Sequence, residues 1–579
     1  MNEDNRNWLV FALLAVLLLV GWPLVTSKFF PAANPPVTKI EQGKSTVVAP
    51  PPAVAAAKVR DRNAVLAESP RVAVETPSLS GSINLKGARI DDIVLPGYRE
   101  TIAKNAPPIR LFSPSGTQNT YFATVGWTGD GVATPGPDTV FAASAKVLKP
   151  GSPVMLSWTN PAGQRFLIRV AVDDHFMFTI DQAVINTAAT PISVKPYALV
   201  SRTGVGTDIG TWTNHVGPIG AFGDGVHYDI NYDSLRDTQP GFFGKMFGKD
   251  GVGRSYYFDT TGGWAGFGDK YWLAALIPDQ RAAVHSGFQK SSADQFQSDV
   301  TRASSVVAPG KSLVTTTHLF AGAKEVTTLD GYEKSLGIGY FGLAIDWGWF
   351  KIVEKPIFVY LDWLFHLVGN FGLAIILLTV TIRALIFPIA QRQFASMAAM
   401  KAIQPKMKAI QEKHKDDKAR AQQEVMALYK AEKVNPLAGC LPTFLQIPIM
   451  YSLYKVLLLS IEMRHQPFVG WIKDLSAPDP ATILNLFGTL PFTPVGFLAI
   501  GVVPVLLGVS MYFQFKLNPA PMDEAQKQVF AIMPWVLMFV MAPFAVGLQV
   551  YWITSNCITI LQQRLLYARH PGLQTAPAK

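Results

Sequence analysis

Long apolar stretches after Gly339 constrain the fold of this chain more than any other feature. Five of them lie at about residues 357–388, 437–459, 495–515, 529–546 and 548–566. Each reaches or approaches the roughly 20 residues that an α-helix needs to cross the hydrocarbon core of a bilayer. The composition agrees, because only 16% of the residues are charged and the mean hydropathy is +0.21. The pattern predicts a polytopic α-helical membrane protein.

A sixth apolar stretch occupies residues 8–25, behind a short polar head. No A-x-A motif closes it, so we predict an uncleaved transmembrane anchor over residues 1–28, with cleavage behind Ala32-Ala33 as the alternative. Together with the later stretches this gives six spans. Residues 29–79 are rich in Pro and Ala, which predicts an extended linker.

Residues 80–338 have the character of a soluble β domain. Phe166 begins an alternation of apolar and other residues that runs to Val172, Asp173-Asp174 supplies a turn, and the alternation resumes at Phe176. This is the pattern of a β-hairpin, and the whole region predicts an antiparallel β-sandwich. An aromatic-rich segment at 339–356 predicts a helix lying at the membrane interface. A helical core over 357–567 and a tail over 568–579 complete the expected order.

The distribution of charge predicts the topology. Residues 383–433 hold eleven Lys or Arg and five Asp or Glu, a net charge of +6, whereas the loop at 455–480 has a net charge of zero. By the positive-inside rule, residues 383–433 and the C-terminus are cytoplasmic. Six spans then place the N-terminus in the cytoplasm as well and the β domain on the opposite side.

The basic loop itself predicts a helical hairpin at about 391–433. It is rich in Ala, Lys, Gln, Glu and Met, Pro405 fits the first turn of a helix, and a polar turn follows at 414–417. Two interpretations stay open. The charge serves only topology, or the hairpin docks on ribosomal RNA or on anionic lipid headgroups.

Arg383 is the residue with the sharpest functional signal. Apolar residues flank it on both sides, and a charge at the centre of a span costs about 2.5–3.5 kcal/mol on insertion scales. Thr379 lies one helical turn earlier on the same face. The alternative is a snorkelling side chain, because Arg383 is only about five residues from the expected cytoplasmic end. Polar residues in the other spans would make a wet cavity if they converged on it: Thr443, Gln446, Gln514, Gln549, Thr554, Ser555, Asn556, Thr559, Gln562 and Gln563.

Motifs for nucleotide, metal and hydrolase chemistry do not occur. Two Gly-Lys-Ser triplets lack the first glycine of a P-loop, since Thr38 and Ser305 stand in its place. Neither H-E-x-x-H nor G-x-S-x-G is present, and two cysteines cannot support a disulfide scaffold. We expect no cofactor, no metal and no catalytic residue.

Several segments resemble the YidC/Oxa/Alb membrane-protein insertase family. They are residues 426–442 (MALYKAEKVNPLAGCLP), 446–449 (QIPI), 471–480 (WIKDLSAPDP), 533–534 (MP) and 547–556 (GLQVYWITSN). In the β domain, residues 81–92 (GSINLKGARIDD) and 270–272 (KYW) resemble the periplasmic domain of the Gram-negative branch. The resemblance therefore covers nearly the whole chain apart from the linker.

The resemblance implies a bacterial inner-membrane insertase without covalent catalysis. Its fold would be a five-helix core preceded by an anchor and a periplasmic β-supersandwich. The core would enclose a hydrophilic groove, to which we assign Arg383, Thr379, Gln446, Met450, Gln549 and Trp552. Trp552 stands where many members have tyrosine, so it offers a stacking surface without a hydroxyl. The implied partners are nascent membrane proteins, a Sec translocon, the ribosome and membrane lipids.

Two other classes of protein compete with the insertase as interpretations of the sequence. A solute transporter would need a midplane site and usually internal repeats, and no repeated span pattern is visible. An envelope sugar-processing enzyme is suggested by the likeness of supersandwich domains to mutarotase folds. However, the β domain shows no convincing acid/base pair, and a shared fold does not by itself indicate a shared activity.

Overall fold

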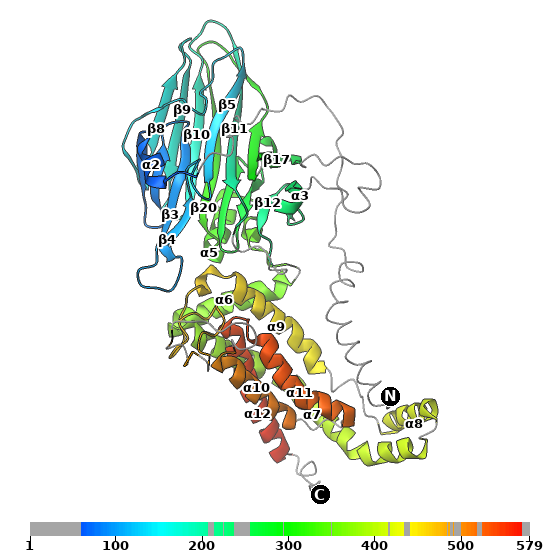
Figure 1. Cartoon of the computed structure of the whole chain (residues 1–579). Coiled ribbons are helices and arrows are strands. Elements are labelled where there is room, and N and C mark those ends of the chain that lie inside the picture. Colours follow the sequence, from blue (N-terminus) through cyan, green and yellow to red (C-terminus); the bar gives the residue numbers. More distant parts are fainter. Residues whose placement is uncertain are drawn as a thin grey trace. The chain divides into compact units, whose positions relative to one another are not determined.

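A computed structural model of the chain describes residues 59–206, 214–223, 225–236, 255–292, 294–348, 350–414, 417–432, 441–482, 485–486, 490, 500–517 and 524–569. The predicted anchor at 1–28, most of the predicted linker and the end of the tail lie outside these residues. The described chain forms a β domain followed by a helical region (Figure 1).

The β domain consists of two sheets, which are antiparallel except where β1 pairs with β7. Among the described residues the first sheet contains β14 (Tyr256–Thr261), β17 (Ala283–Ser292), β18 (Gln295–Arg302), β11 (Ile192–Thr203), β5 (Tyr121–Asp130), β3 (Arg89–Arg99), β2 (Ser80–Asn84), β1 (Arg71–Glu75) and β7 (Val147–Leu148), in that order, with β19 (Ser305–Val307) on β11 and β4 (Pro108–Phe112) on β3. The second contains β13 (Val226–His227), β12 (Gly217–Ala221), β15 (Trp264–Gly268), β16 (Trp272–Pro278), β20 (Ser312–Ala323), β10 (Met177–Ile185), β9 (Arg165–Val172), β8 (Val154–Thr159) and β6 (Ala142–Ala143).

Aromatic side chains from both sheets meet in the core between them. Trp127 of β5 packs edge-on against Phe166 of β9 with 5.2 Å between ring centroids, and Tyr121 of β5 faces Phe267 of β15 at 6.5 Å. Phe166 and Phe267 are fully buried. Such packing is the main source of stability in a sandwich. The predicted β-sandwich is confirmed.

The hairpin predicted around Asp173 is the pair β9 and β10. The strands are antiparallel, with Phe178 opposite Val172 and Ile185 opposite Arg165. Asp173 closes the turn, because its Oδ1 accepts hydrogen bonds from the amides of His175 and Met177, each at 3.0 Å. Alternation of apolar residues was therefore a sound guide here.

The β domain starts earlier than the predicted boundary at residue 80. The short helix α2 (Arg62–Ala67) and strand β1 both lie inside the segment predicted as linker. Val72 and Val74 point into the core and are each 1% exposed. A five-residue strand between prolines gives too short an alternation to stand out from a Pro- and Ala-rich segment.

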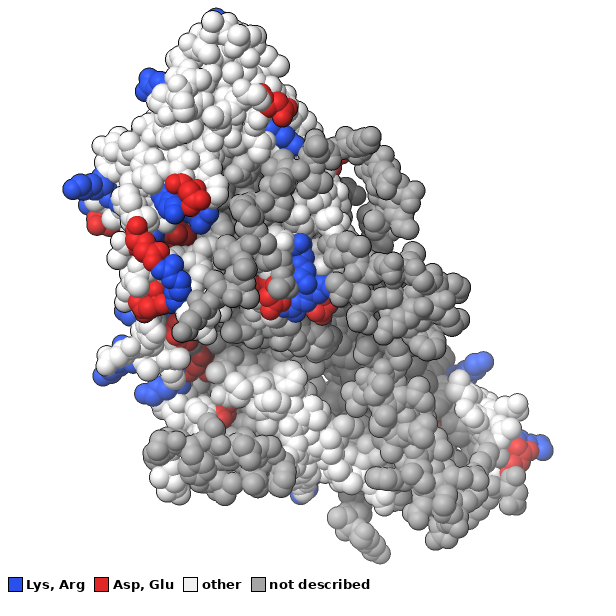
Figure 2. All heavy atoms as spheres, turned by 45° about the horizontal axis from the view of Figure 1, so that its top comes forward, with Lys and Arg blue, Asp and Glu red and all other residues white. Residues whose placement is uncertain are grey.

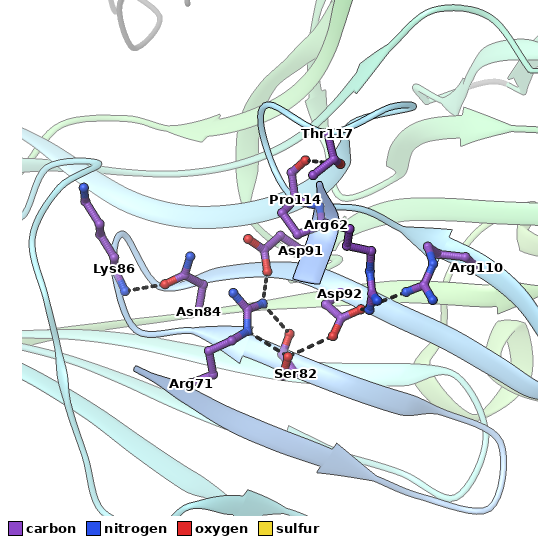
Figure 3. A network of polar contacts seen from close by, with 10 residues as sticks. All are labelled: Arg62, Arg71, Ser82, Asn84, Lys86, Asp91, Asp92, Arg110, Pro114 and Thr117. Carbon is purple, nitrogen blue, oxygen red and sulfur yellow. Dashed lines mark hydrogen bonds and ion pairs between the residues drawn. The ribbon is translucent and has the colours of Figure 1, made fainter. Parts of the chain in front are cut away.

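A network of charged and polar side chains links α2 and strands β1 to β4 at the start of the β domain (Figure 3). It consists of Arg62, Arg71, Ser82, Asp91, Asp92 and Arg110. Asp91 pairs with Arg71, while Asp92 pairs with Arg62 and also accepts hydrogen bonds from Arg110 at 3.0 Å and Ser82 at 2.9 Å. Both carboxylates are buried, so each needs a cation beside it. This network accounts for the two aspartates at the end of the GSINLKGARIDD segment.

The helical region follows the β domain. Its described elements are the 3-10 helix η1 (Phe341–Ala344), α6 (Lys351–Val368), α7 (Phe371–Lys413), α8 (Lys418–Ala431), α9 (Leu441–Leu459), the 3-10 helix η3 (Ile461–Met463), α10 (Val502–Lys516), α11 (Glu524–Met541) and α12 (Val546–Arg569). Besides α2, the described β domain carries the helices α3 (Tyr232–Arg236) and α5 (Val326–Leu336).

The predicted boundary between an interfacial helix at 339–356 and a first core span at 357–388 is wrong. Instead α6 runs to Val368, where Gly369 adopts a left-handed conformation with φ 68° and ends it. Asn370 then caps α7, since its side chain accepts a hydrogen bond from the amide of Leu373 at 3.0 Å. The hydropathy of the sequence does not fall at this junction, so it gives no sign that one helix ends and another begins. Gly369, which can adopt the left-handed conformation, and Asn370, which can cap a helix, are the residues that mark the break.

The first core span is the N-terminal half of α7. Residues Phe371–Gln391 have a mean hydropathy of 2.4 and form the one described helix that is long and apolar enough to cross a membrane. At 1.5 Å per residue they measure about 32 Å. Shorter apolar helices lie at Gln446–Leu459, Val502–Lys516 and Gln528–Met541. The predicted count of six spans therefore stays a prediction.

The basic segment forms two helical arms, as its composition predicts. However, its first arm is a direct continuation of α7 through Pro388 and Pro405 to Lys413, so Pro405 does not start a new helix. Asp417 caps the second arm, α8, through a 3.0 Å hydrogen bond from the amide of Arg420. His414 and Glu424 pair across the turn at 3.0 Å.

Candidate functional site

Arg383 of α7 binds a side chain of α12. Its Nε donates a hydrogen bond to the hydroxyl of Ser555 at 2.9 Å, and one terminal nitrogen donates to the same oxygen. Ser555 is 1% exposed, whereas Arg383 is half-buried. A hydroxyl satisfies part of the hydrogen-bonding capacity of a guanidinium but does not neutralise its charge.

No carboxylate of the described residues forms an ion pair with Arg383. The charge therefore sits within the helical region with a neutral partner, in surroundings where electrostatic forces are stronger than in water. An anionic group that reached this position could form a charge-assisted, bidentate pair with the guanidinium.

Two more helices bring polar side chains to the same part of α12. Gln446 of α9 donates to the hydroxyl of Tyr551 at 2.8 Å, and Tyr551 lies one turn before Ser555. On a different side, Asn556 donates to the hydroxyl of Ser510 of α10 at 2.9 Å. The middle of α12 is thus a polar centre that contacts α7, α9 and α10. Convergence of the polar residues, which the sequence left conditional, occurs for a subset of them.

The other predicted site residues have different environments. Thr379 is fully buried, and its hydroxyl donates to the carbonyl of Ile375 in its own helix at 2.6 Å. Met450 and Trp552 are partly buried at the edge of the hydrophobic core. All three lie within a turn or so of the residues that make the polar centre, and their role in a groove stays a prediction.

The side chain of Gln549 binds backbone carbonyls at the end of α11. Its side chain is fully buried, and its amide nitrogen donates to the carbonyls of Met541 at 3.0 Å and Phe544 at 2.9 Å. Met541 is the last residue of α11 and Phe544 lies in the turn before α12, where carbonyls lack partners within a helix. The geometry gives this glutamine a helix-capping role, and its assignment to the groove stays a prediction.

Tyr551, Ser555, Asn556 and Ser510 also contribute to the polar centre, although the sequence did not assign them to the site. Ser555 and Asn556 are two of ten polar residues that nothing in the sequence distinguishes, and Ser510 is not among those ten. The available signal was spacing, because Tyr551 and Ser555 share one face of α12 as Thr379 and Arg383 share one face of α7. Among the described residues no cluster of three metal-binding side chains occurs.

Comparison with known proteins covers both regions of the chain. Residues 71–360 match the family model described as the YidC periplasmic domain, and residues 363–572 match the one described as the 60Kd inner membrane protein. The chain is 47% identical over 575 residues to the membrane protein insertase YidC of Zymomonas mobilis, covering 98% of this chain and 96% of the relative. It is 42% identical over 602 residues to that of Methylorubrum extorquens, with the same coverage. The chain belongs to the YidC family of membrane protein insertases.

The YidC match confirms the resemblance drawn from short motifs, and it places a periplasmic domain and an inner-membrane region in one chain. The structure also gives the YidC-like segment WIKDLSAPDP a structural explanation. Asp479 accepts hydrogen bonds from the indole of Trp471 at 3.1 Å and from the amide of Val503 at 2.8 Å. The segment therefore ties the loop after α9 to the first turn of α10.

Proposed function

We propose that this chain inserts proteins into the bacterial inner membrane, and that the polar centre around Arg383 receives the part of a client that must cross. The observation that carries the proposal is the guanidinium of Arg383, held by Ser555 and without a described carboxylate partner. Family membership supports the activity, and this geometry supports the site.

The outer surfaces of the helices suit a lipid environment. On α11 five large side chains recur at helical spacing and are 40–55% exposed: Ile532, Trp535, Val536, Phe539 and Val540. Leu373, Leu377 and Val380 of α7 form a similar exposed face. Apolar faces of this extent on a monomer mark contact with a membrane or another protein. Polar residues inside and apolar residues outside are what an insertase with an internal hydrophilic groove requires.

The proposed mechanism lowers a desolvation barrier. A short, often acidic, extramembrane tail of the client enters the groove, attracted by Arg383, and exchanges bulk water for groove water and fixed polar groups. Its apolar segment then slides along the lipid-facing side of the core into the bilayer. Burial at about 25 cal/mol per Å² drives that step for a complete span, so no ATP hydrolysis is needed.

The other elements of the proposal concern topology and partners. Six spans with both termini in the cytoplasm follow from the charge distribution. The hairpin built from the end of α7 and from α8, together with the C-terminal tail, would meet the ribosome or anionic lipid. Clients arrive either directly or with a Sec translocon. The basic excess fits these roles better than nucleic-acid binding by the β domain, since charges of both signs are interspersed on the face seen in Figure 2.

Reconstitution tests the proposal most directly. The full-length protein in liposomes receives a single-span client with a short acidic tail, and a second client in which the acidic residues are replaced by their amides. We expect the wild-type protein to insert both clients into a protease-protected position. We expect Arg383→Ala to lose most of its insertion of the acidic client. Arg564→Ala is the matched control, because Arg564 is exposed on α12.

The outcomes separate the activity from the arginine. If empty liposomes insert the clients equally well, the insertase proposal fails. If Arg383→Ala retains full activity on both clients, insertion stands but Arg383 is a snorkelling residue. If Arg383→Ala reduces the insertion of both clients equally, the arginine supports the fold of the core and does not recognise the acidic tail.

A further inference from the structure

The loop after α9 is attached to the β domain by two charged side chains. Arg464 donates hydrogen bonds to the carbonyls of Arg99 at 2.8 Å and Glu100 at 3.2 Å, and its guanidinium lies over the rings of Tyr271 and Trp272 at 5.7 and 5.6 Å. This contact uses the KYW segment of the β domain, which the proposed function leaves without a role.

Glu462 makes the second attachment, two residues earlier. Its Oε1 accepts a hydrogen bond from the amide of Val326 at 3.0 Å, at the first residue of α5. The N-cap residue Glu325 provides no side-chain cap of its own, because its carboxylate is engaged by Tyr98 at 2.6 Å and Thr328 at 2.6 Å. Glu462 therefore caps α5 from another part of the chain.

The environment of the second carboxylate oxygen of Glu462, Oε2, disfavours a negative charge. Oε2 is buried and has no hydrogen-bond partner in the described structure. The charged groups around it are mainly acidic: Glu325 at the N-cap of α5 and Asp362 of α6, which pairs with His366. Arg464 lies on the same loop but directs its guanidinium toward two backbone carbonyls, and Tyr98 of β3 is the remaining titratable neighbour. Burial, with these carboxylates nearby, raises the pKa of Glu462 to about 7.

We propose that Glu462 is a pH-sensitive latch between the β domain and the loop that follows α9. In the neutral form its carbonyl oxygen accepts the Val326 amide and no charge is buried. In the ionised form the same position holds an uncompensated charge beside two carboxylates, so the contact opens more often. Because Glu462 comes three residues after the end of α9, the latch controls how firmly the helix that carries Gln446 is fixed to the β domain.

The sign and size of the effect follow from linkage. A carboxyl with an ordinary pKa of 4.5 when the latch is open and about 7 when it is closed stabilises the closed form fully below pH 4.5, and this stabilisation is lost as pH rises through 7. Between pH 6 and pH 8 the population of the open form should rise about tenfold.

Hydrogen exchange of the full-length protein in nanodiscs measures this opening. Exchange of the peptide that contains the Val326–Leu329 amides is recorded at pH 6 and pH 8 and corrected for intrinsic rates. We expect about tenfold less protection at pH 8 in the wild type and less than a twofold change in Glu462→Gln, which keeps an oxygen acceptor but cannot ionise.

Glu333→Gln is the matched control. Glu333 is also a half-buried carboxylate of this region that accepts a backbone amide, that of Gly342 at 2.7 Å. It should retain the wild-type pH dependence at Val326. Exchange in β10 and β20, measured on the same samples, shows whether each variant is folded. Equal protection of wild type at the two pH values, or a tenfold change that persists in Glu462→Gln, would overturn the latch. No client protein is involved, so such a failure leaves the insertase proposal intact.

Discussion

The guanidinium of Arg383 and the hydroxyl of Ser555 join α7 to α12 through a 2.9 Å hydrogen bond between residues 172 positions apart. This contact orients a positive charge inside the helical region with a neutral partner. An arginine beside a carboxylate would be an ion pair already satisfied, whereas the proposed role of Arg383 toward an anionic client requires a neutral partner such as Ser555.

Ser555→Ala should weaken insertion of an acidic client about three- to tenfold while the protein stays folded. Loss of one hydrogen bond to a charged group corresponds to about 1.5–3 kcal/mol at most, and a half-buried guanidinium recovers part of it from water. Thr554→Ala is the control, because the Thr554 hydroxyl bonds to the carbonyl of Val550 within its own helix at 2.8 Å. Equal activity of Ser555→Ala and wild type would show that Ser555 does not orient Arg383.

Gln446 and Tyr551 should be energetically coupled. Their hydrogen bond is 2.8 Å long and Tyr551 is 1% exposed, so we expect a coupling free energy of about 1 kcal/mol. Gln446→Leu, Tyr551→Phe and the double variant, unfolded by denaturant in detergent, form the cycle. If the two single effects simply add, the contact contributes nothing to holding α9 against α12.

Asp479 should be the most sensitive position in the loop between α9 and α10. Its carboxylate is 6% exposed and accepts hydrogen bonds from Trp471, from the amide of Ala481 at 2.9 Å and from the amide of Val503. Asp479→Ala leaves three donors without an acceptor and should lower the free energy of unfolding by about 3 kcal/mol. Asp474→Ala provides the comparison within the loop, since Asp474 accepts hydrogen bonds from Ser476 and lies 3.9 Å from the His465 ring in the described structure. A loss no larger than that of Asp474→Ala would contradict the capping role.

Asp299 should make the β domain less stable as pH rises. Burial raises the pKa of this carboxyl above its ordinary value of 3.8, although Tyr257 donates a hydrogen bond to it at 2.8 Å. Stability from the neutral form is complete below pH 3.8 and is lost as pH rises through the raised pKa. Asp299→Asn should therefore match wild type in acid and exceed it at pH 7.5.

Hydrogen exchange of β17 and β18 in the full-length protein resolves this effect from the helical region. Asp130→Asn is the control, because Asp130 is exposed at the end of β5 in the same sheet. If Asp299→Asn and wild type differ by the same factor at pH 4.5 and pH 7.5, the titration of Asp299 does not influence stability.

Sequence patterns predicted the structure correctly wherever the residues of a single helix or strand are enough to define it. Alternation predicted β9 and β10, hydropathy predicted the span within α7, and an arginine among apolar residues marked the site. The failures share a cause as well. Strand β1 is five residues long, and Gly369 and Asn370 break an apolar stretch whose hydropathy does not change. In both cases the decisive signal is a few residues within a much longer segment of uniform composition.

Sequence by itself determined the class of protein, the order of its regions and the arginine at the centre of the candidate site, because composition, periodicity and an isolated charge among apolar residues are properties of neighbouring residues. Only the tertiary structure decided the partners. Arg383 meets Ser555, Gln446 meets Tyr551, and Gln549 caps the end of α11, although all of these looked alike as polar residues in apolar helices. Hydrogen bonds between helices depend on which faces pack together, and a single sequence does not record that choice.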